Sequence, residues 1–266
     1  MFIFNKPPVI TEYVIESHKL GKDERNVFAV ISDLHECRFG RDNGFLIEAL
    51  NEIRPDALII AGDLINAYAE GDPYFTMETL NTLHKQYPLI FFAPGNHESK
   101  ILKRPVFKKQ MLCFQREMEK AGLSLLRNGY RDAFNGLRIY GLELDHEFYR
   151  RFVIKRLPEK MLEELLGRAE GERFNILIAH DPAHFPDYIK WKPDLILSGH
   201  VHGGLIRIPG IGGLIGPAYT PFPKYDSGLY EKDGVKMIVS RGAGSHTINL
   251  RINNPPEILK LVIKGI

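Results

Sequence analysis

Five short polar motifs contain the residues of this chain whose types suit metal chemistry. In chain order they are Asp33-Leu34-His35, Gly62-Asp63, Gly95-Asn96-His97-Glu98, His180 and Gly199-His200-Val201-His202. Carboxylates, an amide oxygen and imidazoles are oxygen and nitrogen ligands that suit manganese, iron or zinc. The ligands are spread along the chain and no closely spaced cysteines accompany them, which argues against a structural zinc site. The sequence therefore predicts a transition-metal site of a catalytic kind.

The number of candidate ligands indicates two ions. The motifs offer seven ligands, which is more than one metal needs. A carboxylate with two oxygens, such as Asp63, can bridge two ions about 3.5–4 Å apart, a spacing that clamps the attacking and leaving oxygens of a displacement at phosphorus. A bridging water loses its proton near neutral pH. We therefore expect a phosphate ester to be cleaved by attack of a metal-bridging hydroxide.

Each motif by itself is weak evidence. An Asp-x-His or Gly-Asp sequence after a strand is usually turn chemistry, and a lone histidine such as His180 is more often a hydrogen-bonded core residue. Gly95-Asn96-His97-Glu98 is more telling, because four turn-forming or polar residues follow the apolar run 89–93 without a helical pattern. An extended backbone at Gly199-His200-Val201-His202 would turn both histidines to the same face. The order of the motifs, each after an apolar run, argues against coincidence.

Short apolar runs place these motifs at the ends of buried strands. The predicted strands are 27–32, 57–62, 89–93, 176–179 and 195–198. Helical patterns around 45–53 and 75–83 separate the first three strands. Alternating strands and helices indicate parallel strands, and ligands bind at the carboxyl ends of such strands. We therefore expect the five motifs to converge on one site.

The rest of the chain completes an α/β fold. The remaining predicted elements are helices at 107–121 and 158–166, a glycine- and proline-rich loop at 205–225, and strands at 235–240 and 258–263. The expected fold class is α/β, a two-sheet mixed β sandwich flanked by helices. No convincing linker divides the chain, so we expect a single domain over residues 1–266.

Composition and charge narrow the functional class. The 266 residues are 44% hydrophobic and 26% charged, as in a soluble globular protein. The formal net charge of +2 gives no strongly positive field, so we expect no specific nucleic-acid partner, and a nuclease would need a local basic groove. Cys37 and Cys113 form no disulfide framework, and no apolar run suits a signal peptide or a membrane span. We expect a cytoplasmic protein, with membrane association as the alternative, and the sequence leaves the oligomeric state open.

Taken in this order, the five motifs resemble those of the calcineurin-like metallophosphoesterase superfamily. Segments of the second half are similar to its YkuE/YaeI-like phosphodiesterase branch, and the resemblance extends from about Val27 onward. These segments are Gly203-Gly204, Arg207-Ile208-Pro209, Pro221-Phe222-Pro223-Lys224-Tyr225, Gly228-Leu229-Tyr230, Val239-Ser240-Arg241-Gly242-Ala243-Gly244 and Asn254-Pro255-Pro256-Glu257. The resemblance implies a four-layer α/β/β/α sandwich and a metal-dependent phosphoric ester hydrolase, a phosphodiesterase or phosphatase.

The resemblance also implies a role for each motif residue. One metal would be held by Asp33, His35 and His202 and the other by Asn96, His180 and His200, with Asp63 bridging them. His97 would approach the phosphate and either stabilise its charge or protonate the leaving oxygen. Glu98 stands where many relatives carry aspartate, and it would orient His97. The implied cofactors are two divalent or trivalent ions of manganese, iron or zinc.

Further features bear on the substrate and on the membrane. Arg38 and Arg41 flank the first motif and are predicted to bind a substrate phosphate, the alternative being solvated loop charges. The segment 148–157 combines aromatic, aliphatic and basic residues, which is typical of peripheral membrane contact but also of an edge element with solvated arginines. Apolar residues of the loop 205–225 either line a pocket for a lipid-like or nucleoside-bearing ester or pack over the sheet.

The leading prediction is an enzyme that hydrolyses a phosphodiester or phosphomonoester of a small-molecule or lipid-like compound. A narrower alternative is a hydrolase of lipid-linked or nucleotide-sugar pyrophosphates. The alternative of another class is a non-catalytic, metal-binding scaffold that keeps the fold. Every predicted ligand position and His97 carry a competent residue, which favours catalysis.

Overall fold

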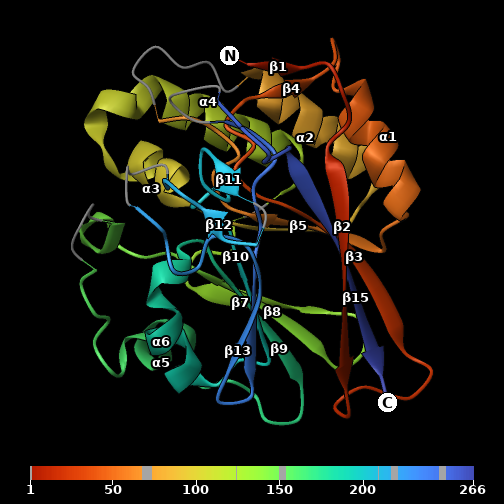
Figure 1. Cartoon of the computed structure of the whole chain (residues 1–266), viewed down its shortest axis with the longest axis vertical. Helices are drawn as coiled ribbons and strands as arrows, with labels where there is room; N and C mark the ends of the chain where they lie inside the picture. The colour runs from red at the N-terminus through yellow and green to blue at the C-terminus, as the bar shows by residue number, and fades with distance from the viewer. Residues whose placement is uncertain are drawn as a thin grey trace.

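Two β-sheets stacked on each other form the centre of the molecule (Figure 1). The structure, a computed structural model, describes residues 2–67, 74–123, 125–149, 154–208, 210–216, 221–245 and 250–266. The five-stranded sheet has the order β2-β15-β3-β5-β6, and the six-stranded sheet has the order β13-β14-β10-β9-β8-β7. Each sheet contains parallel and antiparallel neighbours.

The five-stranded sheet contains the strands that were predicted to precede the first three motifs. Its members are β2 (Val9–Ser17), β15 (Glu257–Gly265), β3 (Arg25–Ile31), β5 (Ala57–Ala61) and β6 (Ile90–Ala93). β3, β5 and β6 are parallel, with Val30 opposite Ile59 and Ile59 opposite Phe91. These strands are apolar throughout their centres, because a parallel strand is covered on both faces. The register brings their carboxyl ends to one edge of the sheet.

The six-stranded sheet supplies the strands before the last two motifs. Its members are β7 (Gly129–Ala133), β8 (Leu137–Leu142), β9 (Phe174–Ala179), β10 (Leu195–Ser198), β14 (Val235–Val239) and β13 (Gly228–Lys232). β9 and β10 are parallel neighbours, so the residues that follow them emerge on the same edge. Two small pairs lie outside the main sheets: β1 (Ile3–Phe4) with β4 (Arg38–Phe39), and β11 (Arg207–Ile208) with β12 (Gly212–Gly213).

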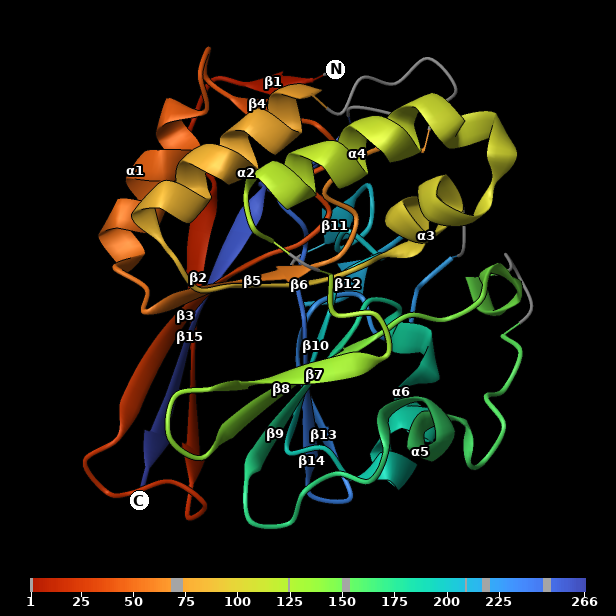
Figure 2. The same ribbon diagram turned by 180° about the vertical axis from the view of Figure 1, so that it is seen from behind.

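Helices cover the outer side of each sheet (Figure 2). The α-helices are α1 (Gly44–Ile53), α2 (Tyr74–Gln86), α3 (Asn96–Lys103), α4 (Lys108–Lys120), α5 (Met161–Leu166) and α6 (Phe185–Tyr188). The 3₁₀ helices are η1 (Pro105–Phe107), η2 (His146–Tyr149), η3 (Pro182–His184) and η4 (Ile189–Trp191).

Three apolar clusters hold these layers together. The first packs α1, α2 and α4 on the five-stranded sheet, the second lies between the sheets, and the third packs α5 and α6 on the six-stranded sheet. Phe28, Ile59 and Ile176 of the second cluster are fully buried. The predicted fold class, a four-layer α/β/β/α sandwich, is therefore confirmed.

The elements that the sequence did not predict include β8, inside the six-stranded sheet, and three strands at sheet edges. β2, β7 and β13 lie at the edges of their sheets and expose much of their length, so they lack a continuous apolar run. The predicted helix 107–121 is α4, which starts at Lys108 after the 3₁₀ turn η1, whereas α5 starts at Met161, three residues later than predicted. The loop 205–225 contains the short β11–β12 pair.

The third motif is helical, which corrects the expectation that Asn96, His97 and Glu98 lie in a turn. They form the first turn of α3, which begins after Gly95. The Glu98 carboxylate accepts a hydrogen bond from the Gly95 main-chain N–H at 2.9 Å, a capping interaction that starts the helix. The pattern was overlooked because this helix is short and polar, and its stability comes from the cap and from burial.

Among the described residues, no helix combines the length and the apolar character that crossing a bilayer requires. The single-domain organisation over residues 1–266 stays a prediction.

Candidate metal centre

Five loops at the carboxyl ends of β3, β5, β6, β9 and β10 bring the motif residues together. Main-chain hydrogen bonds tie neighbouring loops to each other: Asp33 N donates to Gly62 O at 3.0 Å, His35 N to Asp63 O at 3.1 Å, and Gly199 N to His180 O at 3.0 Å. The loops of both sheets are therefore held as one rigid edge, and their side chains have defined positions.

The backbone at the centre is strained in a consistent way. Of the seven predicted ligands, five have a left-handed conformation, with φ of 51° at Asp33, 49° at His35, 54° at Asp63, 69° at His200 and 53° at His202. This conformation costs a residue with a side chain about 1 kcal/mol or more, and it persists where surrounding contacts require it. It turns the chain sharply at the strand ends so that the side chains point back to the sheet edge.

The left-handed turns correct the expectation for His200 and His202. An extended backbone would have placed both rings on one face, but here the two rings join different groups of side chains. His202 lies with Asp33 and His35, and His200 lies with Asp63 and His180. The same motif therefore contributes to two neighbouring positions.

Close approach of the loops requires small residues. A Cβ atom built on Gly95 would overlap with Asp63 Oδ1. The Asp63 carboxylate can therefore lie against the start of α3, where its Oδ1 accepts a hydrogen bond from His97 N at 2.8 Å. This N-terminal contact favours negative charge on Asp63.

Three overlapping groups of side chains place their ligand atoms within 4.8 Å of one another: Asp33, His35 and His202; Asp63, His180 and His200; and His35, Asp63 and His97. In the first group, Nε2 of His35 and Nε2 of His202 lie 3.1 Å apart, and His202 Nε2 lies 3.5 Å from Asp33 Oδ1. Two nitrogens that bind the same ion at about 2.1 Å would lie roughly 3.0–3.4 Å apart. The side chains thus converge as metal ligands do.

Asp63 belongs to the second group and also faces His35 of the first. Its Oδ2 is 3.1 Å from His180 Nε2 and 3.8 Å from His35 Nε2. Asp33 Oδ1 also lies near both histidines, at 3.7 Å from His180 Nε2 and 3.9 Å from His35 Nε2. Both carboxylates therefore face both positions, and Asp63 makes the closer contact with His180, as a bridging ligand would.

The hydrogen bonds of His180 and His35 at Nδ1 turn Nε2 of each ring toward the carboxylates. His180 Nδ1 faces the carbonyl oxygen of Ala61 at 2.7 Å, and His35 Nδ1 faces Asn66 Oδ1 at 3.0 Å. The Asn66 amide nitrogen donates to His35 O at 2.7 Å, which fixes its oxygen toward the ring. A ring nitrogen that faces an acceptor must carry the proton, so Nε2 of each neutral ring keeps its lone pair.

His97 has the opposite arrangement. Its Nδ1 accepts a hydrogen bond from the main-chain N–H of Ala67 at 2.8 Å, so Nδ1 is unprotonated and the neutral ring carries its proton on Nε2. The ring lies against His35, with ring centroids 4.9 Å apart. This tautomer suits a hydrogen-bond donor at Nε2 better than a metal ligand.

Two buried polar atoms fit a cation at this place. Among the described residues, neither Asn96 Oδ1 nor His180 Nε2 makes a hydrogen bond, although His180 Nε2 faces the carboxylates of Asp33 and Asp63. An unpaired buried polar atom costs about 1–3 kcal/mol, so most such atoms in proteins have a partner. A metal ion ligated by both atoms would remove this cost. The donor set and these unpaired atoms therefore fit the metals that the sequence predicts.

The charges of the buried carboxylates and imidazoles also fit a bound cation. Burial alone would raise the pKa of Asp63, but the imidazoles of His180, His97 and His35 hold that pKa well below its usual range. Burial disfavours charge on His180, yet the carboxylates of Asp63 and Asp33 raise its pKa to about 10. A proton on His180 thus balances the buried carboxylates. A cation would replace this proton, so metal binding is expected to release protons.

Glu98 lies beneath the loops and supports them, which corrects the expectation that it chiefly orients His97. Its carboxylate accepts main-chain hydrogen bonds from Asp63 at 2.8 Å, Gly95 at 2.9 Å and Ile65 at 3.1 Å. Burial and the charge of Asp63 raise the pKa of Glu98 to about 7. Glu98 therefore fixes the relative position of the Asp63 and Asn96 loops, and the His97 ring is held by Ala67.

Three contributors were not found by sequence reasoning. Asn66 orients His35, Tyr149 places its ring 5.7 Å from the ring of His200, and the Arg251 guanidinium lies 3.4 Å from His202 Nδ1. Asn66 follows Asp63 closely in sequence, but its spacing alone carries no chemical signal. Tyr149 and Arg251 lie about fifty residues from their histidine partners, and only the fold brings them there.

Other predicted residues lie at the margins of the centre. Arg38 is in β4, and Arg41 is exposed in the turn that follows. Their contact with a substrate phosphate stays a prediction. Of the segment 148–157, residues 150–153 lie outside the described residues, as do Pro209 and Tyr219 of the loop 205–225.

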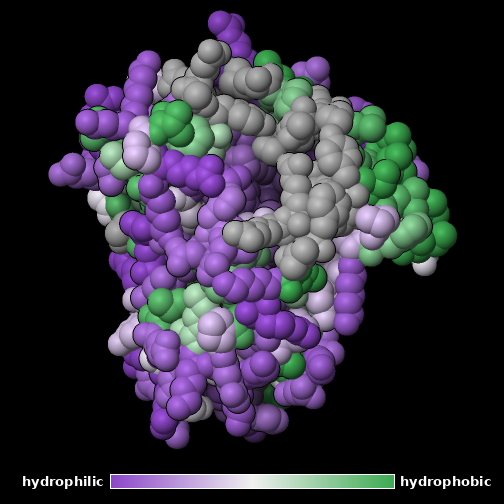
Figure 3. All heavy atoms as spheres, turned by 90° about the vertical axis from the view of Figure 1, so that its left-hand side faces the viewer, coloured by the Kyte–Doolittle hydropathy of each residue, from purple (hydrophilic) through white to green (hydrophobic). Residues whose placement is uncertain are grey.

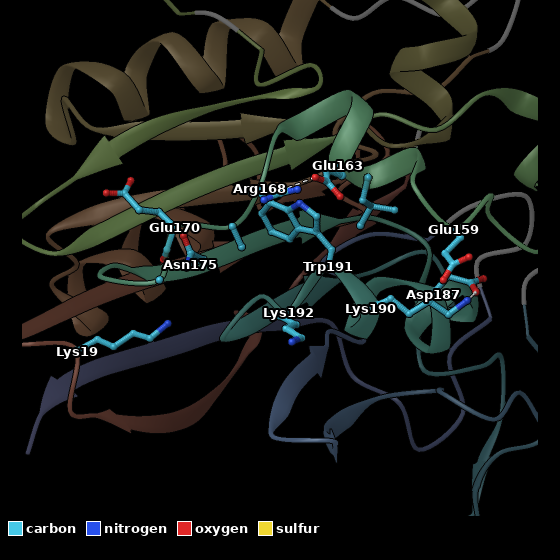
Figure 4. Close-up of a pocket in the computed structure, with 13 residues that line it drawn as sticks. Lys19, Glu159, Glu163, Arg168, Glu170, Asn175, Asp187, Lys190, Trp191 and Lys192 are labelled. Atoms are coloured by element: carbon cyan, nitrogen blue, oxygen red, sulfur yellow. Dashed lines mark hydrogen bonds and ion pairs between the residues drawn. The ribbon is translucent and has the colours of Figure 1, made fainter.

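A surface cavity of about 520 Å³ lies beside α5 and η4 (Figure 4). Its lining includes Lys19, Glu163, Arg168 and Lys190 beside Trp191, and none of the motif residues. Charges of both signs alternate around it, so its lining favours no particular ligand class.

Comparison with known proteins finds one matching family model, related sequences and structures of similar fold. The calcineurin-like phosphoesterase family model matches residues 27–204. The chain is 28% identical over 225 residues to YkuE of Bacillus subtilis, an uncharacterized metallophosphoesterase, covering 83% of this chain and 72% of that one. It is 29% identical over 265 residues to an uncharacterized metallophosphoesterase of Aquifex aeolicus, covering 96% and 92%. Among solved structures, vacuolar protein sorting 29 of Cryptosporidium parvum aligns with a TM-score of 0.46 at 14% identity, over 91% of this chain and 88% of that one.

Proposed function

This chain belongs to the calcineurin-like phosphoesterase family, and from this premise we propose that it cleaves a phosphodiester or phosphomonoester at a centre of two metal ions. Membership makes it a metal-dependent phosphoesterase. The two-ion centre and the ester class are our proposal, supported by the ligand groups described above.

The ligand groups supply the proposed metal positions. Asp33, His35 and His202 would hold one ion, Asn96, His180 and His200 would hold the other, and Asp63 would bridge them. When bound, the ions supply Lewis acidity, a nucleophile derived from water and a clamp on the phosphoryl oxygens. The protein contributes fixed ligand tautomers through Ala61 O and Asn66 Oδ1, so the site is assembled before substrate arrives.

His97 is proposed to donate a proton or a hydrogen bond from Nε2 to an oxygen of the substrate phosphate. Because the Ala67 N–H occupies Nδ1, the donor is a positioned neutral imidazole. Such a donor stabilises charge on a phosphoryl or leaving oxygen as it develops. The main-chain contact also fixes the ring plane, so the Nε2–H direction is set by the fold.

The observation that carries this proposal is the division of the histidines by tautomer. His35 and His180 face acceptors through Nδ1 and present a lone pair, whereas His97 faces a donor through Nδ1 and presents a proton. A scaffold without catalysis would need ligands but no such donor beside them. This division therefore favours an enzyme over a metal-binding scaffold.

Metal content tests the two-ion centre. Purified protein loaded with Mn²⁺, Fe²⁺ or Zn²⁺ and then desalted is expected to hold two ions per chain by elemental analysis. Asp63→Asn should lower occupancy more than any other single ligand change, because its carboxylate offsets the repulsion between both ions. Saturation at one ion per chain, or full occupancy in Asp63→Asn, would show that the two-ion assignment is wrong.

An activity screen tests the ester class. The metal-loaded protein is expected to hydrolyse bis-p-nitrophenyl phosphate or p-nitrophenyl phosphate, and chelation should abolish the activity. Nucleoside diphosphate sugars and a lipid-linked pyrophosphate test the pyrophosphatase alternative. A fully loaded protein that hydrolyses none of these compounds would favour the scaffold instead.

A further inference from the structure

The β11–β12 hairpin and the segments paired with it carry a group of exposed apolar side chains. Ile211 and Phe222 each expose 66% of their surface, and Ile208, Leu250 and Ile252 are also exposed. Main-chain hydrogen bonds join the three segments: Arg207 N donates to Ile252 O at 3.0 Å, and Phe222 N donates to Leu214 O at 2.8 Å. The five side chains therefore belong to one continuous structure, which we call the apolar hairpin.

The apolar hairpin projects from the molecule. Figure 3 shows hydrophobic residues gathered on a lobe at its right-hand edge, which is the side that faces the viewer in Figure 1, where β11 and β12 lie. Soluble proteins rarely expose several large apolar side chains together, and such patches mark interaction surfaces. The shape of a projecting lobe suits insertion into a partner.

The base of the hairpin is fixed to the metal centre. The Asn254 amide donates to His202 O and to Gly204 O, both at 2.7 Å, and Arg207 donates to Gly203 O at 3.1 Å. Gly203 and Gly204 directly follow His202. A partner that binds the hairpin is therefore held at a defined distance from the metal centre.

The charge around the hairpin suits an anionic surface. Residues 203–225 and 240–256 contain no aspartate or glutamate. Lys224 is exposed and lies two positions from Phe222, and the carboxylate nearest in sequence, Asp226, is partly buried and paired with Arg207 at 2.8 Å. An apolar tip beside a cation, without exposed carboxylates, is the composition of an element that enters the interface of a lipid bilayer.

We infer that the apolar hairpin docks on the surface of a bilayer that contains anionic phospholipid, with Ile211 and Phe222 inserted and Lys224 at the headgroups. Docking of this kind would hold the metal centre beside the interface, where phosphate esters of lipids lie. The docking surface does not depend on the proposed hydrolase activity, because binding to vesicles requires no substrate.

Flotation with vesicles of phosphatidylcholine and phosphatidylglycerol tests the inference. The wild-type protein is expected to float with these vesicles, and the double variant Ile211→Ser/Phe222→Ser should bind at least about tenfold more weakly, because two large apolar side chains are lost from the interface. Lys224→Glu should weaken binding to the anionic vesicles about fivefold or more, and less so at high salt.

A matched control uses another exposed apolar pair. Val106 and Leu112 expose 67% and 54% in the η1–α4 region, and Val106→Ser/Leu112→Ser should leave vesicle binding unchanged. Hydrolysis of bis-p-nitrophenyl phosphate in solution should be the same in both double variants and the wild type, which verifies folding. If no activity is found, vesicle binding still reports on the hairpin separately.

A fluorescent probe locates the tip directly. Phe222→Trp adds a second tryptophan to a chain whose sole tryptophan, Trp191, is buried at 8% exposure. The emission of the introduced indole should shift to the blue with vesicles and be quenched by brominated lipid. The inference is overturned if the wild type does not bind vesicles, if the control pair carries the binding, or if the introduced indole stays unquenched. Loss of self-association in the hairpin variant without any vesicle binding would assign the surface to a protein partner instead.

Discussion

Single hydrogen bonds decide what each histidine of the centre can do. A carbonyl oxygen at His180 Nδ1 and an amide oxygen at His35 Nδ1 each fix the proton on Nδ1, so Nε2 can act as a ligand. A main-chain N–H at His97 Nδ1 fixes the proton on Nε2. Similar rings in one cluster thereby take different roles, although a histidine in the sequence does not show which nitrogen is free.

His97 is predicted to act in the chemical step and not in metal binding. His97→Ala should retain both metals and a nearly normal KM but lower kcat roughly 10²–10⁴-fold, the usual range for general acid catalysis. The loss should be greater for an alkyl ester than for a p-nitrophenyl ester, because p-nitrophenolate leaves without protonation. Steady-state kinetics and elemental analysis check both points.

His84→Ala provides a control, since His84 lies at the end of α2, away from the three ligand groups. Loss of a metal in His97→Ala would make His97 a ligand, as the group with His35 and Asp63 allows. Equal losses for alkyl and aryl esters would leave only charge stabilisation.

Arg251 is predicted to position His202 and the loop beneath Asp33. Its guanidinium donates to the carbonyl oxygens of Arg241 at 3.0 Å and Gly242 at 3.1 Å and lies 3.4 Å from His202 Nδ1. Arg251→Met should weaken metal binding about 10–100-fold, as the loss of groups that orient ligands does. Calorimetric titration with Mn²⁺ should show the loss mainly in one of the two sites.

Arg241→Met is the matched control for this change. Arg241 is in the same region, but its guanidinium pairs with Glu257 at 2.6 Å, away from the ligands. Its replacement should lower stability without a selective loss of metal affinity. Arg251→Lys should recover part of the binding, because an ammonium group can still donate to the carbonyls. If both arginine variants changed metal affinity alike, Arg251 would have only a structural role.

The loop after β14 lies outside the region matched by the family model and packs against the metal centre. The loop after β14 lies against the loop after β3, with Ala243 N donating to Ser32 O at 2.9 Å and Gly244 N to Asp33 O at 2.7 Å. A Cβ atom on Gly244 would overlap with Leu34 O, which belongs to the backbone and cannot swing aside. This contact fixes the conformation of the Asp33 loop.

Gly244→Ala is therefore predicted to destabilise the protein and to disturb the first ligand group. The added methyl group should cost about 1–3 kcal/mol in the free energy of unfolding, as overpacking does, and should weaken metal binding through Asp33. Gly171→Ala is the control, because a Cβ atom there meets nothing within 4 Å. Its effect should lie within about 0.5 kcal/mol of the wild type. Thermal unfolding with and without metal measures both, and a silent Gly244→Ala would show that the loops can separate at little cost.

The two sheets of the sandwich must keep a fixed relative position, because both contribute ligand residues to the metal centre. Glu143, which follows β8 of the six-stranded sheet, pairs with Lys103 of α3 at 3.3 Å and with Arg127 at 2.6 Å. Lys103 is the last residue of α3, which begins with Asn96 and His97, so these ion pairs connect the carboxyl end of that helix to the opposite sheet. The inter-sheet core supplies the larger apolar contribution.

The contribution of the Glu143 ion pairs to the free energy of unfolding is predicted to depend on pH. Burial alone would raise the pKa of Glu143, but the hydrogen bond and charge of Arg127 and the charge of Lys103 bring that pKa below 4.5. A lowered pKa in the folded state means that the stabilisation is present above pH 4.5 and is lost as the pH falls through the folded value. Glu143→Gln should therefore cost about 1–2 kcal/mol at neutral pH and progressively less in acid.

Denaturant unfolding of the metal-free wild type and Glu143→Gln variant, from neutral pH to acid, measures how the cost of the substitution changes with pH. Glu147→Gln is the control, since the Glu147 carboxylate is 45% exposed and pairs with Lys155 on the surface, where ion pairs contribute little. A Glu143→Gln cost that did not diminish in acid would show that the carboxylate charge is not what stabilises the contact.

The fold class and the sheet edge on which chemistry is expected could both be predicted from the sequence. Buried parallel strands need continuous apolar runs, and the residues after such strands must emerge together, so local patterns were enough to predict a two-sheet sandwich flanked by helices. The four-layer α/β/β/α arrangement, also confirmed, was implied by the family resemblance. Edge strands such as β2 and β7 escaped because their exposed faces remove that pattern. The residue types of the five motifs also determined which chemistry to expect.

The roles of the individual motif residues could not be predicted in this way, because they depend on contacts in the folded chain. His180 receives its orienting contact from Ala61, 119 positions away, and His202 lies beside Arg251, 49 positions away. The left-handed turns at His200 and His202 send neighbouring rings to different groups, and the cap at Gly95 makes a helix of the third motif. These features depend on contacts between distant segments and on backbone strain that such contacts impose, and neither leaves a periodic signal in the sequence.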